Sequence, residues 1–354
     1  MNKEHIQQWL EQENEQKLQE LWSKADEIRK QTVADQVHLR GLIEISNHCI
    51  RQCTYCGLRS AHKDIERYRM TRQEIIDCAM ETVDYGYGTI VMQAGEDYGI
   101  KAAWLAEIIK TIKSKTKLAV TLSLGERPDE DFVLWRQAGA DRYLIRFETT
   151  DQKLYQQIHP PLPNQTRNRF DILHRLKELG YEAGSGVMIG IPGQTYESLA
   201  NDIYTFKELD LDMIGVGPYI AHPDTPLAQQ NNKLNTKKQV PNTELMVYKV
   251  LALTRIVCPE ANIPSTTALA TINRTTGREL GLSRGANVVM PNITPTRYRK
   301  LYEIYPGKAC LNETAQQCQG CMRKRIESIG RTIGTGPGFR VRRVRELESK
   351  GVRE

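Results

Sequence analysis

The stretch Gly41-Leu42-Ile43-Glu44-Ile45-Ser46-Asn47-His48-Cys49-Ile50-Arg51-Gln52-Cys53-Thr54-Tyr55-Cys56-Gly57 joins a short apolar run to a loop with three cysteines. Residues 41–45 are typical of a buried strand, and Cys49, Cys53 and Cys56 follow in the spacing C-x3-C-x2-C. A cubane iron–sulfur cluster normally takes four thiolates. Three thiolates on one loop therefore predict a 4Fe–4S cluster with one iron left open.

Two other uses of clustered cysteines fit these residues less well. A structural zinc site closes with four ligands, typically as separated pairs, and the nearby fourth donor, His48, stands directly beside Cys49. Disulfides belong to oxidising compartments, whereas residues 2–30 are polar and charged and show no secretory apolar segment. We therefore expect a cytoplasmic protein whose eight cysteines serve metal or redox chemistry.

An open iron suits S-adenosylmethionine (SAM), because SAM carries an amino and a carboxylate group that can chelate it. The aromatic residue Tyr55 stands just before the third cysteine. With this residue and this spacing, the loop resembles the signature of the radical SAM enzymes.

Length and charge limit the other classes of function. The chain has 354 residues with 40% hydrophobic content, enough for one large barrel or two ordinary domains. No apolar stretch approaches the length of a membrane helix. The net charge of +6 is concentrated in the run 340–345, which we interpret as a solvated terminal helix and not as a nucleic-acid site. We expect no membrane or nucleic-acid partner, and a surface loop at residues 229–235.

The order of apolar and amphipathic segments predicts an α/β fold. Residues 1–38 form a helical extension, and residues 39–305 alternate apolar runs with segments of helical length. One such helix starts at a capping box from Thr71 to Glu74, and another runs from near Thr195 to Leu209. Strands that are apolar on both faces indicate a parallel sheet covered by helices. We predict a (β/α)8 TIM barrel, with an open doubly wound sheet as the alternative; the eight expected strands are 42–45, 89–93, 118–123, 143–147, 186–189, 213–219, 263–267 and 286–290.

Polar residues collect where these strands end. Active sites of such barrels lie at the carboxyl ends of the strands. We therefore expect the side chains of the strand ends to meet at one rim; they are 93–97, Thr121, Ser123, Glu126, Arg146, Glu148, Met188, 190–193, Thr266 and Thr267.

Several longer strings carry a resemblance that covers nearly the whole chain. They are the cysteine loop and residues 67–71, 93–97, 121–126, 140–144, 215–227, 262–268 and 285–292. These strings resemble the HydE family of FeFe-hydrogenase maturases, within the biotin synthase-like radical SAM enzymes. The resemblance implies a full radical SAM barrel that acts in assembly of the hydrogenase H-cluster. It also implies an iron–CO–CN–cysteine complex as substrate, other hydrogenase maturases as partners, and a flavodoxin or ferredoxin as electron donor.

The resemblance also assigns roles to residues at the cofactor end. The three cysteines hold the cluster, SAM binds its open iron, and one electron cleaves SAM to a 5′-deoxyadenosyl radical. Arg169 clamps the SAM carboxylate, although a surface arginine is the alternative from the residues alone. Glu148 binds the ribose hydroxyls or the amino group. Further cofactor contacts are Gly95, Glu96 and Asp97 at the amino group, Tyr55, Gly190, Ile191 and Pro192 at the adenine, and Ser123 and Met188.

The substrate end has its own implied set. It comprises Thr121, Arg146, Met213, Thr266, Thr267, Tyr302 and Tyr305, since hydroxyls and a guanidinium suit cyanide and carboxylate groups. Met213 could equally pack in the core, and the two tyrosines could lie on a helix surface.

Three other readings of the chain stay open. In a biotin synthase-like enzyme a second cluster would lie inside the barrel, but the strand ends here offer Gln93, Ser123 and Met188 in place of cysteines. A methylornithine synthase-type mutase shares the barrel and part of the cysteine loop. A non-enzymatic iron–sulfur scaffold needs no polar barrel rim.

A second cysteine triad follows the last expected strand, in the C-terminal extension 306–354. Cys310, Cys318 and Cys321 have the spacing C-x7-C-x2-C. We predict an accessory 2Fe–2S or 4Fe–4S cluster at the outer edge of the barrel mouth, with three ordinary thiols as the alternative.

Overall fold

The computed structural model describes residues 1–163, 168–230, 239–341, 344 and 349. Residues 342, 343 and 345 of the basic run 340–345, and residues 231–235 of the polar stretch 229–235, lie outside these ranges. The strands are β1 Gln36–Ser46, β2 Thr89–Ala94, β3 Ala119–Ser123, β4 Arg142–Leu144, β5 Glu182–Ile189, β6 Met213–Pro218, β7 Val288–Val289 and β8 Thr332–Ile333. The helices are α1 Lys3–Glu11, α2 Glu15–Val33, α3 Arg72–Asp84, α4 Ala102–Lys115, α5 Asp129–Gln137, α6 Gln152–Ile158, α7 Arg169–Glu178, α8 Tyr196–Glu208, α9 Pro226–Gln230, α10 Glu244–Val257, α11 Thr267–Ile272, α12 Gly277–Leu282, α13 Thr296–Arg299 and α14 Ala315–Ser328.

The strands form one curled parallel sheet in the order β6-β5-β4-β3-β2-β1-β7. The order follows the chain from β1 to β6 without a reversal, as in a barrel and unlike a doubly wound sheet. Isolated parallel bridges from Met213 to Asn262 and from Pro264 to Val288 continue the pairing from β6 towards β7. The predicted TIM-barrel-like architecture is therefore confirmed.

The last two expected strands are much shorter than predicted. Of residues 263–267, only Pro264 makes a bridge, and Thr266 already caps α11 by accepting from the backbone N–H of Leu269. Proline lacks a backbone N–H for a strand ladder. Of residues 286–290, only Val288 and Val289 form a strand. The predicted capping box at Thr71 and the helix that follows Thr195 are both present.

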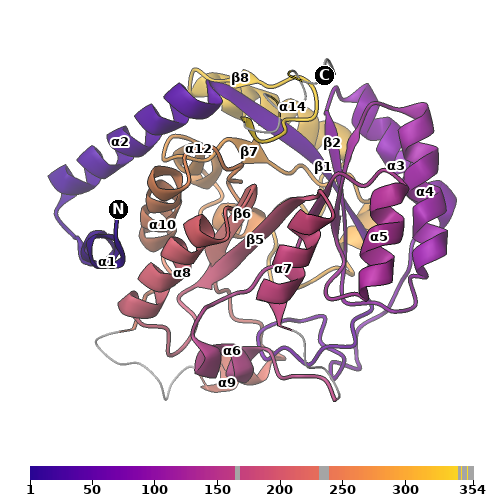
Figure 1. The fold of residues 1–354 in the computed structure, drawn as a ribbon, viewed down its shortest axis with the longest axis horizontal. Helices are drawn as coiled ribbons and strands as arrows, with labels where there is room; N and C mark the ends of the chain where they lie inside the picture. Colours follow the sequence, from indigo (N-terminus) through magenta and orange to yellow (C-terminus); the bar gives the residue numbers. More distant parts are fainter. Residues whose placement is uncertain (164–167, 231–238, 342–343, 345–348, 350–354) are drawn as a thin grey trace.

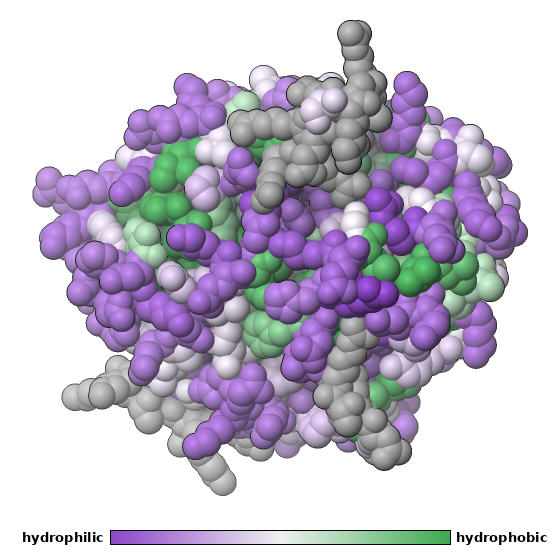
Figure 2. Space-filling model, in the orientation of Figure 1, coloured by the Kyte–Doolittle hydropathy of each residue, from purple (hydrophilic) through white to green (hydrophobic). Residues whose placement is uncertain are grey.

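Two N-terminal helices replace the single expected extension. The break falls at residues 12–14, where the Asn14 side chain caps α2 by accepting from the backbone N–H of Lys17. In Figure 1, α1 lies beside α8 and α2 beside α10, and these pairs are in contact. Hydrophilic side chains cover most of the face in Figure 2, with apolar ones in small groups. No helix in the described ranges is both long and apolar enough to cross a bilayer.

A C-terminal segment closes the amino end of the barrel. We call residues 334–340 the floor segment. Strand β8, just before it, pairs with the start of β1. Carbonyl oxygens of the floor segment then accept from barrel side chains: Pro337 from Thr89 (2.8 Å) and Arg142 (2.9 Å), and Gly338 from Arg40 (3.2 Å). The opposite, carboxyl end of the strands is left for the loops that carry the site.

Candidate active site

The loop between β1 and α3 carries the first three cysteines and is shaped by one arginine. The Arg67 guanidinium donates to the carbonyl oxygens of Asn47 and Leu58 through Nη1, and to those of Arg59 (2.9 Å) and His62 (3.1 Å) through Nη2. The loop has no helix or strand between residues 47 and 67, so these contacts take the place of the backbone hydrogen bonds of regular secondary structure. Arg67 belongs to a string that carried the family resemblance, but no pattern in that string predicts this role.

The three cysteines lie close to the protein interior. Cys53 is buried, and Cys49 and Cys56 are partly exposed. Burial raises the pKa of Cys49 and of Cys53, and it raises the pKa of Cys56 to about 12. Because metal binding requires thiolates, a bound cluster would have to displace these protons. Among the described residues, no three His, Cys, Asp or Glu side chains are grouped so as to hold a single metal ion.

The end of β2 packs directly against the cysteine loop. A Cβ on Gly95 would lie 2.3 Å from the carbonyl oxygen of His48 and 2.8 Å from Cβ of Cys49, so only glycine fits. The Glu96 carbonyl accepts from the backbone N–H of Ile50 (3.0 Å). The backbone of this predicted SAM segment therefore lies beside the first cysteine.

The carboxylates of Glu96 and Asp97 are used within the protein. Glu96 accepts from Arg51 (2.7 Å), and Asp97 accepts from Arg69 (2.7 and 2.9 Å) and Ser46 (2.7 Å). Burial raises the pKa of Glu96; burial of Asp97 is outweighed by the Arg69 and Ser46 hydrogen bonds, which lower its pKa. Neither side chain lines a cavity described below. Two loop arginines thus hold both carboxylates, and the contact of residues 95–97 with the SAM amino group stays a prediction.

Arg169 begins α7 and is buried, which excludes the alternative of a surface arginine. It donates to Glu126 Oε1 (3.0 Å), to Nε2 of His159 (3.0 Å) and to the carbonyl oxygen of Arg146. Glu126 also pairs with Arg51 (2.8 Å). Burial of Glu126 is outweighed by its neighbour His159 and by Arg169 and Arg51, which lower its pKa to about 2.

A cavity of about 260 Å³ opens beside the third cysteine, and we call it the cofactor cavity. Glu148 stands in its wall with a φ of 63°, a strained conformation for a residue other than glycine. Its carboxylate accepts from Tyr55 Oη (3.3 Å) and lies 3.1 Å from Arg146 Nη2. Of the predicted cofactor contacts, the structure brings together around this cavity Tyr55, Ser123, Glu148, Arg169 and Met188. Gly190, Ile191 and Pro192 are not among the lining residues.

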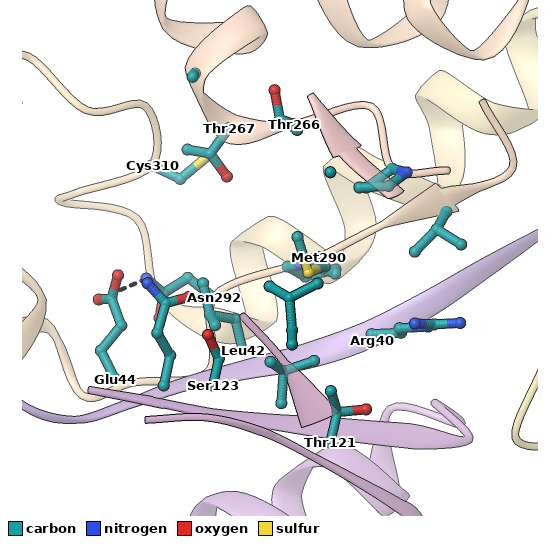
Figure 3. A pocket seen from close by; sticks show the side chains of 18 of the residues that line it. Arg40, Leu42, Glu44, Thr121, Ser123, Thr266, Thr267, Met290, Asn292 and Cys310 are labelled. Atoms are coloured by element: carbon teal, nitrogen blue, oxygen red, sulfur yellow. Dashed lines mark hydrogen bonds between the residues drawn. The ribbon is translucent and has the colours of Figure 1, made fainter. Parts of the chain in front are cut away.

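A second cavity of about 220 Å³ fills the barrel interior, and we call it the interior cavity. Figure 3 shows Thr266, Thr267 and Cys310 across this cavity from Glu44 and Ser123, with Arg40 at its far end. Predicted substrate residues in its wall are Thr121, Arg146, Met213, Thr266, Thr267 and Tyr305. Tyr302 is buried behind the wall, and its hydroxyl accepts from Gln93 Nε2 (3.2 Å). The helix-surface alternative for both tyrosines is thus excluded.

The two cavities adjoin each other and share part of their walls. The shared residues are Gln93, Ser123, Leu144, Arg146, Thr266, Ala268, Ile304 and Tyr305.

Charged residues of the interior cavity were missed by sequence reasoning. Glu44 lies in the apolar run of β1, accepts from Lys308 Nζ (2.6 Å) and from Asn292 Nδ2 (3.0 Å), and is buried. A charge inside the run Gly41-Leu42-Ile43-Glu44-Ile45 was the available signal. Arg40 lies four residues before Glu44 on β1 and is also buried in the wall of this cavity.

The second cysteine triad is divided between two environments. Cys310 and Cys318 line the interior cavity, whereas Cys321 is exposed on α14. The Cys310 backbone has a φ of 63°. Hydrogen bonding to Cys318 lowers the pKa of Cys310 to about 6, and the same contact raises the pKa of Cys318. The triad therefore reaches further inward than the predicted outer edge of the mouth.

Comparisons with known proteins agree with this geometry. Residues 43–203 match the model of the Radical SAM superfamily. The chain is 48% identical to the FeFe-hydrogenase maturase subunit HydE of Thermotoga maritima, over 91% of this chain and 89% of that protein. It is 27% identical to the 3-methylornithine synthase of Methanosarcina acetivorans, over 90% and 86% of the two chains. The crystal structure of a methylornithine synthase (PylB) has the same fold, with a TM-score of 0.77, 22% identity and 94% of both chains covered.

Membership of the superfamily implies a 4Fe–4S cluster and SAM, and the residues present fit both. Three thiols share one loop, and the third lines the cofactor cavity. Within the described residues, the buried atoms Arg146 Nε and Tyr219 Oη in that cavity, and Thr121 Oγ1 and Arg40 Nε in the interior cavity, have no hydrogen-bond partner. Buried polar atoms without partners are expected where a polar ligand binds. From the cysteine loop, the hollow barrel and the 48% identity to HydE over most of its length, the chain belongs to the HydE family of radical SAM enzymes.

Proposed function

We propose that the protein cleaves SAM reductively and acts on an iron–CO–CN–cysteine complex during maturation of the FeFe-hydrogenase H-cluster. The observation that carries this proposal is that the cofactor cavity and the interior cavity adjoin and share wall residues. A reactive species formed at the cysteine end would therefore arise next to the space that a substrate in the barrel would occupy. Exclusion of water from such a site protects a radical from side reactions.

The cofactor end has residues suited to SAM. Cys49, Cys53 and Cys56 would hold the cluster, which supplies the electron that cleaves SAM to a 5′-deoxyadenosyl radical. Arg169 presents a guanidinium to the cavity, and guanidinium binds carboxylate in bidentate fashion. Glu148 offers a carboxylate to the ribose hydroxyls or to the amino group.

The substrate end carries hydroxyl and cationic groups in a largely apolar wall. Thr266, Thr267 and Tyr305 supply hydroxyl groups, and Arg146 supplies a guanidinium between the two cavities. These groups can donate to the nitrogen of a cyanide ligand and to the carboxylate of a cysteine. This is the chemistry expected of an organometallic iron substrate.

The test begins with anaerobic reconstitution of the cluster, followed by SAM and dithionite. We expect 5′-deoxyadenosine from the parent and none from Cys49→Ala, Cys53→Ala or Cys56→Ala. Unchanged cleavage in all three variants would refute the cluster assignment.

The second stage of the test concerns the substrate. We expect the protein to restore hydrogenase maturation in an extract that lacks its HydE but contains the other maturases, with a reduced flavodoxin or ferredoxin as electron donor. Formation of 3-methylornithine, without restored maturation, would instead favour a mutase like the methylornithine synthases.

We also propose that Cys310, Cys318 and Cys321 bind an accessory 2Fe–2S or 4Fe–4S cluster. The support is their spacing and the closeness of the first two, which hydrogen-bond to each other. Triple replacement by Ala should lower the iron content and leave SAM cleavage near the parental level. If cleavage disappeared while the first cluster stayed loaded, these cysteines would belong to the catalytic machinery.

A further inference from the structure

His159 links a cysteine of the loop to the arginine of the cofactor cavity. It follows α6 directly and is 4% exposed. Its Nδ1 lies 3.0 Å from Sγ of Cys53, and its Nε2 lies 3.0 Å from Nη2 of Arg169. No sequence pattern marks this residue, which stands alone before Pro160 and Pro161.

The contacts determine which ring nitrogen carries the proton. A guanidinium has only donors, so the nitrogen that faces Arg169 must accept. This leaves the proton on Nδ1, where it points to the Cys53 sulfur. Glu126 Oε1 lies 3.4 Å from Nε2, a longer contact, and it already accepts from Arg169 Nε at 3.0 Å. The ring therefore donates to sulfur and accepts from the arginine.

We infer that His159 is a positioning residue that donates a hydrogen bond to the cluster sulfur of Cys53 and raises the reduction potential of the cluster. The inference rests on the cluster assignment proposed above. A hydrogen bond to a ligand sulfur stabilises the reduced cluster, which carries more negative charge, and is one of the factors that set these potentials. Because the same ring contacts Arg169, it also couples the cluster to the group proposed to bind the SAM carboxylate.

Two variants separate the hydrogen bond from the bulk of the ring. His159→Leu fills the site without a donor. His159→Asn places an amide N–H near the position of Nδ1 and keeps the donor. The reduced fraction of the cluster is measured by EPR in dithionite-poised titrations without SAM, on protein with parental iron content.

We expect the midpoint potential of H159L to be more negative than that of the parent. At the parental midpoint, its ratio of reduced to oxidised cluster should fall about tenfold, which is about 59 mV for one electron. H159N should stay close to the parent. Tyr155→Phe is the matched control, because the Tyr155 ring packs 5.2 Å from the His159 ring and under Arg169, and the substitution keeps that ring and leaves His159 in place; its midpoint should not move.

A second measurement needs no leucine variant. Protein labelled with ¹⁵N-histidine should show ¹⁵N couplings to the reduced cluster in pulsed EPR, and H159N should lose one of them while the label in His48, beside Cys49, remains. A parental midpoint in fully loaded H159L, an equal shift in H159L and H159N, or an unchanged set of ¹⁵N couplings in H159N would each overturn the inference. A parent that takes up no cluster would instead overturn the proposed function.

Discussion

At the scale of one residue, the buried carboxylate of Asp202 connects two segments that line the cofactor cavity. It is fully buried on α8 and accepts from the backbone N–H and the hydroxyl of Thr150, both at 2.6 Å. It also lies 3.4 Å from Nε2 of Gln194, which donates to the carbonyl oxygen of Met188 (3.1 Å). One side chain thus joins the segment after Glu148 to the segment after β5.

Asp202 predicts a pH dependence of stability. Burial raises its pKa from 3.8 to about 7. An acid whose pKa is raised by folding binds its proton more tightly in the folded state. Its contribution is therefore fully present below pH 3.8 and is lost as the pH rises towards 7. The loss can reach about 4 kcal/mol, at about 1.4 kcal/mol per pH unit.

Replacing Asp202 by Asn should remove this dependence. The free energy of unfolding of D202N, relative to the parent, should increase as the pH rises from about 4 to about 7. Urea unfolding at a series of pH values measures it. Asp77→Asn, at an exposed position on α3, is the control and should follow the parent. Parallel profiles for D202N and the parent would contradict the prediction.

Some residues of the site could be predicted from the sequence, and others could not. The resemblance to the HydE family predicted cofactor roles for Tyr55, Ser123, Glu148 and Arg169, and the cavity brings these together. From the residues alone, Arg169 would have been interpreted as a surface arginine. His159 could not be predicted as a site residue, because its partners Cys53 and Arg169 come together only when the loop and α7 fold against each other. A contact between loops leaves no periodic pattern in the chain.

At the scale of the element, the cysteine loop depends on Arg67 for its shape. Replacing Arg67 by Met should leave four carbonyl contacts unmade, at a cost of about 2–3 kcal/mol to the ordered loop. Cluster binding should weaken about tenfold or more. The measurement is iron bound per protein after anaerobic reconstitution at limiting iron.

Arg72→Met provides the matched control for Arg67→Met. Arg72 lies exposed at the start of α3 and donates to the hydroxyl of Thr111 (2.9 Å). The R72M variant should bind iron like the parent. Equal iron uptake by R67M and R72M would show that the loop does not need the arginine.

At the scale of the whole molecule, the sequence predicted the barrel but not its closure. The first six strands were predicted in their places because each is a continuous apolar run. The rest of the barrel wall consists of isolated bridges at Asn262 and Pro264 and of the two-residue strand β7. Their pairing partners include residues far away in the chain. The floor segment was missed for the same reason, since its backbone carbonyls accept from Arg40, Thr89 and Arg142, which lie far away in the chain.

The floor segment gives the last prediction, at Gly88 before β2. A Cβ at Gly88 would lie 1.7 Å from the carbonyl oxygen of Gly336 and 2.8 Å from the backbone nitrogen of Pro337, so an alanine must displace backbone. The displaced segment would withdraw the acceptor from buried Arg142. We expect G88A to lose about 2–4 kcal/mol of its free energy of unfolding, measured with urea.

Gly86→Ala is the control. Gly86 has a φ of 74° and open space around it, so G86A should lose only about 1 kcal/mol of its free energy of unfolding. Backbone strain alone would reverse this order, because Gly86 and not Gly88 has the left-handed conformation; a larger loss in G86A would therefore mean that the floor segment does not hold the barrel closed.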